Sequence, residues 1–487
     1  MKILLKLFSL KLIASFLGII YSVIQVRYFG ASRTIEVYFA AQSLVYMVMS
    51  LTQSGQLAEV FLPEYHKLNT IRKGMGYWGL NLILTRMLTF GFVFLIIIFI
   101  GAPYLVALMV PGFSVEDKEL TTLIFKIFVP VLFLVISNSF FKTVLNAEER
   151  YGRAEFLGLT NTLVNILVLI VLFPYVQLWA LVISFVLGKF IEFIFYSWQL
   201  YKNGFRFKWI WRLQEFNHNS FFKTMRSTLT YVGATQIYNI VLTASISFLP
   251  EGVYAVFKYV QNLTTKIRGL FIQPFTTIFF TKYSLLLQLG ENVRKEFNKN
   301  FPSIINVNGV IIIGSILLGD YIISLLWENK NFDRGDVTMA YIFLLFNVVG
   351  ILISSIGGLY RKMAVVQGLS KKLYNFWALS QLLTALLSYS LIKYFSVNGL
   401  LFIIPLNVLF TSSVSYFIYK RSKNPMGIKL LTTNNFVILL LIISAIIVKY
   451  VFIPLGENNH LIVAISSVIC LSLYPILITY KIYSAKG

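Results

Sequence analysis

The chain has 487 residues, of which 57% are hydrophobic and only 13% are charged. This composition, with a mean hydropathy of +0.77, excludes a soluble globular protein, because lipid must be the solvent for most of the surface. The formal net charge of +23 suggests nucleic acid as a partner, but the sequence leaves no soluble domain to form a groove for it, so we expect no nucleic-acid binding.

Apolar runs of about twenty residues, the length that crosses a bilayer as a helix, follow one another along the chain. They predict an all-α polytopic membrane protein with about 14 transmembrane helices. The predicted spans begin near Leu10, Ile35, Tyr77, Leu120, Glu155, Leu178, Thr228, Gly252, Pro302, Val337, Leu373, Val397, Phe436 and Leu461.

Lysine and arginine collect in every second connection between these spans. Such a bias marks the cytoplasmic side, and it assigns about 28 of these residues to the inside and about 4 to the outside. The four outer ones are Arg33, Lys118, Lys330 and Arg334. We therefore predict a multi-pass protein of the bacterial inner (plasma) membrane, in contact with membrane lipids and with both termini in the cytoplasm.

The longest basic connection covers residues 201–227. Phe205, Phe207, Trp209 and Trp211 alternate with cations in it. Such a mixture is typical of a helix that lies along the membrane interface. A plain linker between two halves of the protein is the alternative interpretation.

The chain resembles itself at an offset of about 218 residues. Residues 60–65 then lie over residues 278–283, and, with a slip of two residues, Ile-Glu-Val-Tyr at 35–38 lies over Glu-Gly-Val-Tyr at 251–254. Because each repeat holds six spans, the two copies keep the same orientation in the membrane. The repeat predicts two pseudo-symmetric six-helix lobes around a central cavity.

The predicted organisation has four parts. Residues 1–203 form the N-terminal lobe, residues 204–227 a basic amphipathic linker, and residues 228–422 the C-terminal lobe. Residues 423–487 carry two extra helices that lie outside the repeat.

Several short motifs resemble a known family. They are Leu17-Gly18, Val26-Arg-Tyr-Phe-Gly-Ala31, Val37-Tyr-Phe-Ala-Ala41, Phe61-Leu-Pro-Glu-Tyr65, Val110-Pro-Gly-Phe113 and Val144-Leu-Asn-Ala147 before Arg150. This set is similar to the MurJ/MviN lipid II flippases. The resemblance implies the fold of the multidrug/oligosaccharidyl-lipid/polysaccharide (MOP) exporter superfamily. It also implies a flippase that moves an undecaprenyl-diphosphate-linked saccharide by alternating access, with the two extra helices bordering a groove for the polyprenyl tail.

The chain departs from that family at its cavity arginines. Where lipid II flippases carry them in the first, second and eighth spans, Ser15, Tyr21, Met49 and Asn262 stand here, while Glu36 keeps an acid early in the second span. These losses favour another polyprenyl-diphosphate saccharide, as handled by Wzx-type flippases. Lipid II and a polysaccharide repeat unit both stay open as the cargo.

A saccharide bearing a diphosphate cannot cross hydrocarbon unaided, so the protein needs a wet, cationic chamber. The eighth span offers the candidate substrate-binding residues Lys258, Gln261, Asn262, Lys266 and Arg268. Lys258 lies three positions before Gln261 and four before Asn262, so these side chains share one helical face. Lys266 and Arg268 have an alternative, because long cationic side chains extend toward the cytoplasmic boundary.

Three further ionisable residues lie in or beside spans. Arg86 in the third span is either a ligand for the substrate or half of a structural ion pair. Arg27 and Glu36, at facing ends of the first two spans, form either a gate pair that breaks as the outer side opens or a plain interfacial salt bridge.

Cation coupling would need a carboxylate in a helix that faces the cavity. The seventh and eleventh spans, between which the resemblance places such an acid, instead carry the amides Gln236, Asn239, Asn375 and Gln381. Sodium or proton coupling therefore stays possible only through amides and carbonyls, and the membrane potential is another possible driving force. We expect no cofactor, no metal and a monomer.

Catalysis finds no support in the sequence. His66, His218 and His460 fall in connections, and no phosphate-binding loop is present. We therefore expect a protein that is not an enzyme. A cation-coupled drug or metabolite antiporter of the same superfamily is the alternative, but it would not need two extra helices and usually carries a buried acid.

Overall fold

The structure is a computed structural model that describes residues 2–51, 57–148, 150–216, 218–276, 279, 283, 286, 293–422, 433–452 and 460–484. Regular structure in these residues is almost entirely helical, with one isolated bridge between Asn329 and Phe332. A helix satisfies its own backbone hydrogen bonds, which is the requirement that hydrocarbon imposes. The all-α polytopic fold class is confirmed.

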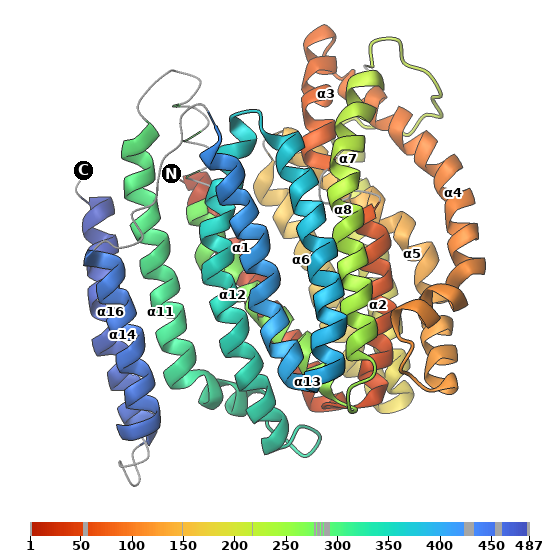
Figure 1. The fold of residues 1–487 in the computed structure, drawn as a ribbon. Helices are drawn as coiled ribbons and strands as arrows, with labels where there is room; N and C mark the ends of the chain where they lie inside the picture. Colours follow the sequence, from red (N-terminus) through yellow and green to blue (C-terminus); the bar gives the residue numbers. More distant parts are fainter. Residues whose placement is uncertain are drawn as a thin grey trace. The chain divides into compact units, whose positions relative to one another are not determined.

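Each predicted span falls on a helix (Figure 1). The elements are α1 (Lys2–Phe29), α2 (Arg33–Leu51), α3 (Leu57–Ile71), α4 (Gly76–Met109), α5 (Val115–Ala147), α6 (Tyr151–Val176), α7 (Leu178–Lys202), α8 (His218–Ile246), α9 (Val253–Ile267), η1 (Arg268–Ile272), α11 (Val293–Trp327), α12 (Arg334–Val366), α13 (Ser370–Lys420), α14 (Thr433–Ile447), η2 (Val448–Phe452) and α16 (His460–Ser484). Within the described residues, 10 of these helices are long and apolar enough to cross a membrane. The second, seventh and eighth predicted spans are α2, α8 and α9, which are shorter or more polar.

Helix α13 accounts for two predicted spans. Its backbone leaves the helical region at Ser396, where φ is 52° and ψ is −131°. Just beyond this kink, a Cβ on Gly399 would lie 2.1 Å from the carbonyl oxygen of Leu391. The sharp turn therefore requires a glycine at this position.

The chain divides into two compact units, Met1–Ala255 and Val256–Gly487. In the first unit α1 packs against α6, α6 against α7, and α5 against α2, α4 and α7. In the second unit α11 packs against α12, α14 and α16, and α12 against α13. The predicted lobe boundaries stay predictions, and residues 277–278, 280–282, 423–432 and 453–459, which belong to the predicted repeat and C-terminal pair, lie outside the described residues.

Glu148, in the connection between α5 and α6, binds residues of three other helices of the first unit. Its Oε1 accepts hydrogen bonds from the hydroxyls of Tyr65, at 3.1 Å, and Tyr77. Its Oε2 accepts from Asn203 Nδ2 at 2.9 Å and forms an ion pair with Arg150 at 3.5 Å. Helices α3, α4 and α7 thus meet at the connection between α5 and α6.

The basic connection after α7 is not a helix over residues 204–216, which we call the strap. The interpretation as an interfacial helix is wrong for this stretch. The physical reason is that side chains of α4 supply partners for its backbone: Asn81 Nδ2 donates to the Arg206 carbonyl at 2.9 Å and Asn81 Oδ1 accepts from Lys208 N at 3.1 Å. The strap therefore runs extended along α4.

Polar contacts fix the two extra C-terminal helices to α11 at two levels. Asn306 of α11 accepts from Asn434 Nδ2 at 3.0 Å and donates to Thr479 Oγ1 at 3.2 Å. Farther along α11, Asp320 forms an ion pair with Lys449 of η2, with Nζ and Oδ1 2.7 Å apart. The side chains of Lys449 and Asp320 are only 10% and 20% exposed, so the pair forms in a low-dielectric environment.

Removing one partner of this pair should destabilise the protein. We expect Lys449→Met to cost about 3 kcal/mol, because it leaves the Asp320 carboxylate buried without its cation. The double variant Asp320→Leu with Lys449→Met should recover most of the loss. Thermal unfolding in detergent measures both variants, and equal losses for the single and double variants would contradict a role for the ion pair.

Candidate functional site

The polar face of α9 continues into a wider turn. Residues Arg268–Ile272 form a single π-helical turn, η1, directly after α9. Such turns are frequent at functional sites, because they redirect side chains that a regular α-helix would align. Gln261, Asn262 and Arg268 follow one another along this face.

A cavity of about 350 Å³ lies against this face within the second unit. Gln261, Asn262 and Arg268 line one side of it, and Asn347 and Ser354 of α12 line another. Thr264, Thr265, Gly350, Ile351, Ile404 and Val408 complete its wall. The cavity thus combines one guanidinium with three amides, three hydroxyls and a few aliphatic side chains, a composition suited to a polar ligand that carries negative charge.

The remaining candidates of the eighth span do not line this cavity. Lys258 is half-buried in α9, one turn before Gln261, and Lys266 is half-buried in the last turn of α9. Of the residues that do line the cavity, Asn262 and Arg268 have exposed side chains. The structure therefore brings three of the five expected residues together around one cavity, and substrate contact stays a prediction for all five.

Asn347 and Ser354 are cavity residues that sequence reasoning missed. The sequence does show that Asn347 is an amide inside the apolar run of the tenth predicted span, which marks it as a candidate functional residue. The sequence does not show which neighbouring helix the Asn347 face of α12 contacts. Only the packing of α12 beside α9 and α13 places both side chains on the cavity.

Arg86 lies in the first unit, on α4, and is half-buried. Its Nη2 donates to the carbonyl oxygen of Trp211 in the strap at 3.2 Å. This contact gives Arg86 a structural role, although with a backbone carbonyl in place of the expected carboxylate. Its contact with substrate stays a prediction.

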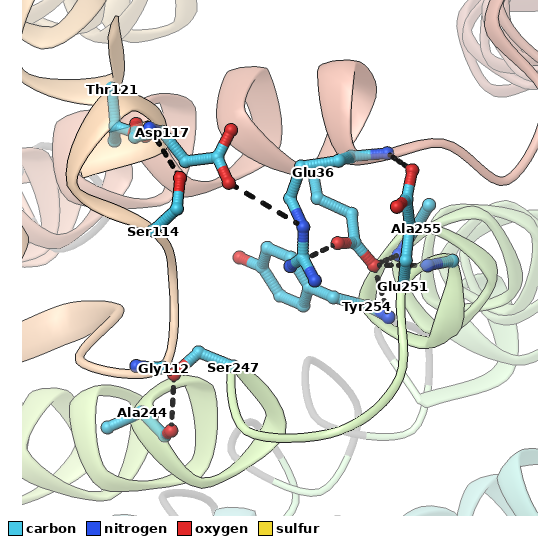
Figure 2. A network of polar contacts seen from close by, with 12 residues as sticks. Glu36, Gly112, Ser114, Asp117, Thr121, Ala244, Ser247, Glu251, Tyr254 and Ala255 are labelled. Carbon is cyan, nitrogen blue, oxygen red and sulfur yellow. Dashed lines mark hydrogen bonds and ion pairs between the residues drawn. The ribbon is translucent and has the colours of Figure 1, made fainter. Parts of the chain in front are cut away.

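A second polar cluster surrounds Glu36, which is completely buried at the start of α2. Its Oε1 accepts hydrogen bonds from three backbone amides at the start of α9, those of Gly252 at 2.9 Å, Tyr254 at 3.0 Å and Ala255 at 3.4 Å (Figure 2). The first amides of a helix have no partner within it and carry partial positive charge, so a carboxylate is favoured there. Glu36 thus caps α9 from another helix.

Arg33 completes this cluster. Its Nη1 lies 2.7 Å from Glu36 Oε2, its backbone N donates to Glu251 Oε1 at 2.6 Å, and its Nε lies 3.9 Å from Asp117 Oδ2. The guanidinium also lies 4.6 Å from the ring centre of Phe113. We call Arg33, Glu36, Asp117 and Glu251, with the amides of residues 252–255, the Glu36 anchor.

Two neutral contacts extend the Glu36 anchor. Gly112 N donates to Ser247 Oγ at 2.9 Å (Figure 2). The hydroxyls of Ser43 and Tyr254 lie 3.1 Å apart. A Cβ on Gly112 would lie 2.4 Å from the Ser247 carbonyl oxygen, so the two loops approach closely. The α8–α9 connection is thereby held against α2 and the start of α5.

Sequence reasoning named Glu36 but chose Arg27 as its cation. Arg33, at the first position of α2, is the cation that the structure places beside Glu36, and Arg27 is exposed near the end of α1. Arg33 was available from the sequence as one of the four outer cations. Its position three residues before Glu36 on the same helix was the missed signal. A gating role for Arg27 and Glu36 stays a prediction.

Comparison with solved structures finds the same helix arrangement in other membrane proteins. One similar structure is "Lipid II flippase MurJ, inward closed conformation", with a TM-score of 0.76 and 18% identity, covering 98% of both chains. Another is the inward-facing conformation of a multidrug resistance MATE family transporter of the MOP superfamily, with a TM-score of 0.64 and 13% identity, covering 83% of this chain and 92% of that one.

The family itself follows from the sequence match. The family model described as "Lipid II flippase MurJ" matches residues 25–468, so the chain belongs to the MurJ family. A probable lipid II flippase MurJ of Buchnera aphidicola subsp. Baizongia pistaciae (strain Bp) is 24% identical, with 94% of this chain and 90% of the relative covered. The resemblance noted in the motifs is confirmed.

The cap on α9 leads to a stability prediction. Glu36→Leu would leave three amides without an acceptor, and we expect it to destabilise the protein by on the order of 3 kcal/mol. Glu36→Gln keeps a carbonyl acceptor and should cost less. Thermal unfolding in detergent measures the difference, with Glu116→Leu, an exposed acid in the first turn of α5, as the control. A Glu36→Leu melting curve equal to that of the control would contradict the capping role.

Proposed function

We propose that this protein translocates an undecaprenyl-diphosphate-linked saccharide from the inner to the outer leaflet of the bacterial inner membrane. Membership of the MurJ family supports the class of cargo. The observation that links the proposal to particular residues is the cavity beside α9. Arg268 lies there among amide and hydroxyl side chains.

The chemistry of the cavity fits such a head group. A guanidinium binds phosphate oxygens with two parallel charge-assisted hydrogen bonds. Amides such as Gln261, Asn262 and Asn347 both donate and accept, as sugar hydroxyls require. Arg268 therefore binds the diphosphate, and the amides bind the saccharide. The proposed cargo includes lipid II and polysaccharide repeat units, which share this chemistry.

The Glu36 anchor is the outer closure in this proposal. Two cations mark its side of the membrane: Arg33 at the start of α2, and Lys118, which follows Asp117 in α5. The positive-inside rule assigns the connections of both residues to the outer side. The anchor joins residues of the predicted N-terminal lobe to residues 251–255 of the predicted C-terminal lobe. Its contacts break when the protein opens outward and reform when it returns.

Energy coupling needs no cofactor in this proposal. In α13, Asn407 Nδ2 donates to Gln381 Oε1 at 3.0 Å and to Thr384 Oγ1 at 2.8 Å, so these amide and hydroxyl oxygens already accept a hydrogen bond. We expect the membrane potential acting on an anionic cargo to contribute, with sodium or proton coupling as the other source of energy.

The protein acts as a monomer, both termini lie in the cytoplasm, and it is a transporter rather than an enzyme. A drug antiporter is not favoured, given the family match and the two helices that pack against α11.

Neutralising Lys258 of α9 and Arg268 of η1 should strongly slow transport. We expect Lys258→Gln with Arg268→Gln to lower the translocation rate at least about tenfold, because the charge-assisted hydrogen bonds of Arg268 to the diphosphate are lost together with the positive charge of the neighbouring Lys258. Translocation is measured in proteoliposomes as head-group accessibility, with lipid II in one series and a polysaccharide repeat unit linked to undecaprenyl diphosphate in another.

The matched control removes the same charge from an exposed site. Lys371→Gln with Lys372→Gln, at the start of α13, should transport like the parent. Equal transport by the Lys258/Arg268 variant and the parent would contradict the proposed anionic site. Native mass spectrometry of the purified parent identifies the cargo, since the mass of a co-purified lipid distinguishes lipid II from another saccharide.

The outer closure predicts slow labelling of a thiol at a half-buried position, Ser43. In a Cys470→Ser background, Ser43→Cys should react slowly with a membrane-impermeant maleimide added from outside, because Tyr254 covers this position. Adding Gly112→Val should raise the labelling rate several-fold, since its side chain collides with Ser247. Glu116→Cys, which is exposed, reports full accessibility. Rapid labelling of Ser43→Cys without the Gly112 change would contradict closure in the resting state.

A further inference from the structure

The strap presents a row of aromatic side chains outward. Phe207, Trp209 and Trp211 are 48%, 55% and 43% exposed, and consecutive ring centres along this row lie 6.2 Å apart. Side chains alternate along an extended chain, so these three point to one face. Large aromatic side chains left exposed in a contiguous row mark a surface that contacts something other than bulk water.

The strap is held in one conformation from several directions. Phe205 and Phe216, at its two ends, are buried in the core of the first unit. Between them, Ile210 N donates to Thr85 Oγ1 at 3.0 Å, in addition to the bonds of Asn81, and Arg86 binds the Trp211 carbonyl. The aromatic row is therefore fixed before any partner arrives, which lowers the entropy cost of binding.

Cations surround this row. Lys202, Arg206, Lys208 and Arg212 are all exposed, and none of them forms an ion pair with another residue that the structure describes. Lys202 Nζ lies 3.6 Å from the ring centre of Trp198 and Lys208 Nζ lies 5.1 Å from that of Trp78.

Two more charged groups complete the surroundings of the row. Arg206 donates to the carbonyls of Tyr201 at 2.7 Å and Phe205 at 2.9 Å, so it helps to hold the strap. Glu215 is the one acidic residue in the sequence of the strap, near its far end. The surface is thus both aromatic and strongly cationic.

The length of α4 places this surface at the membrane interface. Its 34 residues span about 51 Å as a helix, against about 30 Å of hydrocarbon. The strap packs along the first three turns of α4, and the ring centre of Trp211 lies 6.3 Å from that of Phe90, where a run of closely spaced exposed apolar side chains of α4 begins. The connection belongs to the cytoplasmic side by its charge.

We propose that the strap is a binding site for acidic glycerophospholipids of the cytoplasmic leaflet. Trp209, Trp211 and Phe207 insert at the level of the head groups, where aromatic rings are favoured. Lys202, Lys208 and Arg212 bind the lipid phosphates, which attract cations at this surface. The proposal rests on the predicted side of the membrane and is independent of which saccharide is transported.

The test measures lipid binding directly. The full-length protein in a neutral detergent is titrated with phosphatidylglycerol, and bound lipid is counted by native mass spectrometry. We expect Lys202→Gln, Lys208→Gln and Arg212→Gln together to weaken binding on the order of a hundredfold, at about fivefold for each cation. Arg206 is retained, so the variant keeps every hydrogen bond that holds the strap.

Controls separate a site from general attraction. The triple variant Lys371→Gln, Lys372→Gln and Lys420→Gln removes the same charge from exposed positions at the two ends of α13, in two other predicted cytoplasmic connections, and should bind phosphatidylglycerol like the parent. Phosphatidylcholine should bind weakly to all three proteins. An unchanged affinity of the strap variant, or an equal loss in the control variant, overturns the proposal. Matching melting temperatures of the strap variant and the parent show that the strap remains folded.

Discussion

In hydrocarbon there is no water to bind a peptide group, so every departure from a regular helix must be supplied with partners by the protein itself. Two departures in this chain follow that rule. Asn81 and Thr85 bind the backbone of the extended strap, and Glu36 accepts the free amides at the start of α9. These irregular places connect helices and order the surfaces that the proposed function uses.

The same constraint acts on charges. Lys449 and Asp320 lie 2.7 Å apart, and Lys189 and Glu192 of α7 lie 2.9 Å apart. Each pair neutralises groups that would be costly alone in a low-dielectric environment. Arg268, in contrast, lines a cavity among amides and hydroxyls. This difference in surroundings, and not the charge itself, separates structural cations from a candidate ligand-binding one.

Much of the fold could be predicted from the sequence, because hydrophobic length and charge bias are properties of single segments. The polar face of α9 could also be predicted, since spacing along one helix sets it. Asn347 could not be assigned, because its place on the cavity depends on which helices pack together. The strap was misjudged for a similar reason: its aromatic and basic composition favours an interfacial helix, whereas its conformation depends on Asn81 of a distant segment.

The Glu36 anchor brings together the two segments that match each other in the internal repeat, residues 35–38 and 251–254. In that alignment Glu36 corresponds to Gly252, whose φ is +91° and whose Cβ would lie 2.8 Å from the Ala31 carbonyl oxygen. Two identical chains around an axis would place acid against acid or glycine against glycine. Duplication within one chain lets one copy provide the acceptor and the other the donor, so joining the halves makes possible a contact that a symmetric dimer of identical halves would lack.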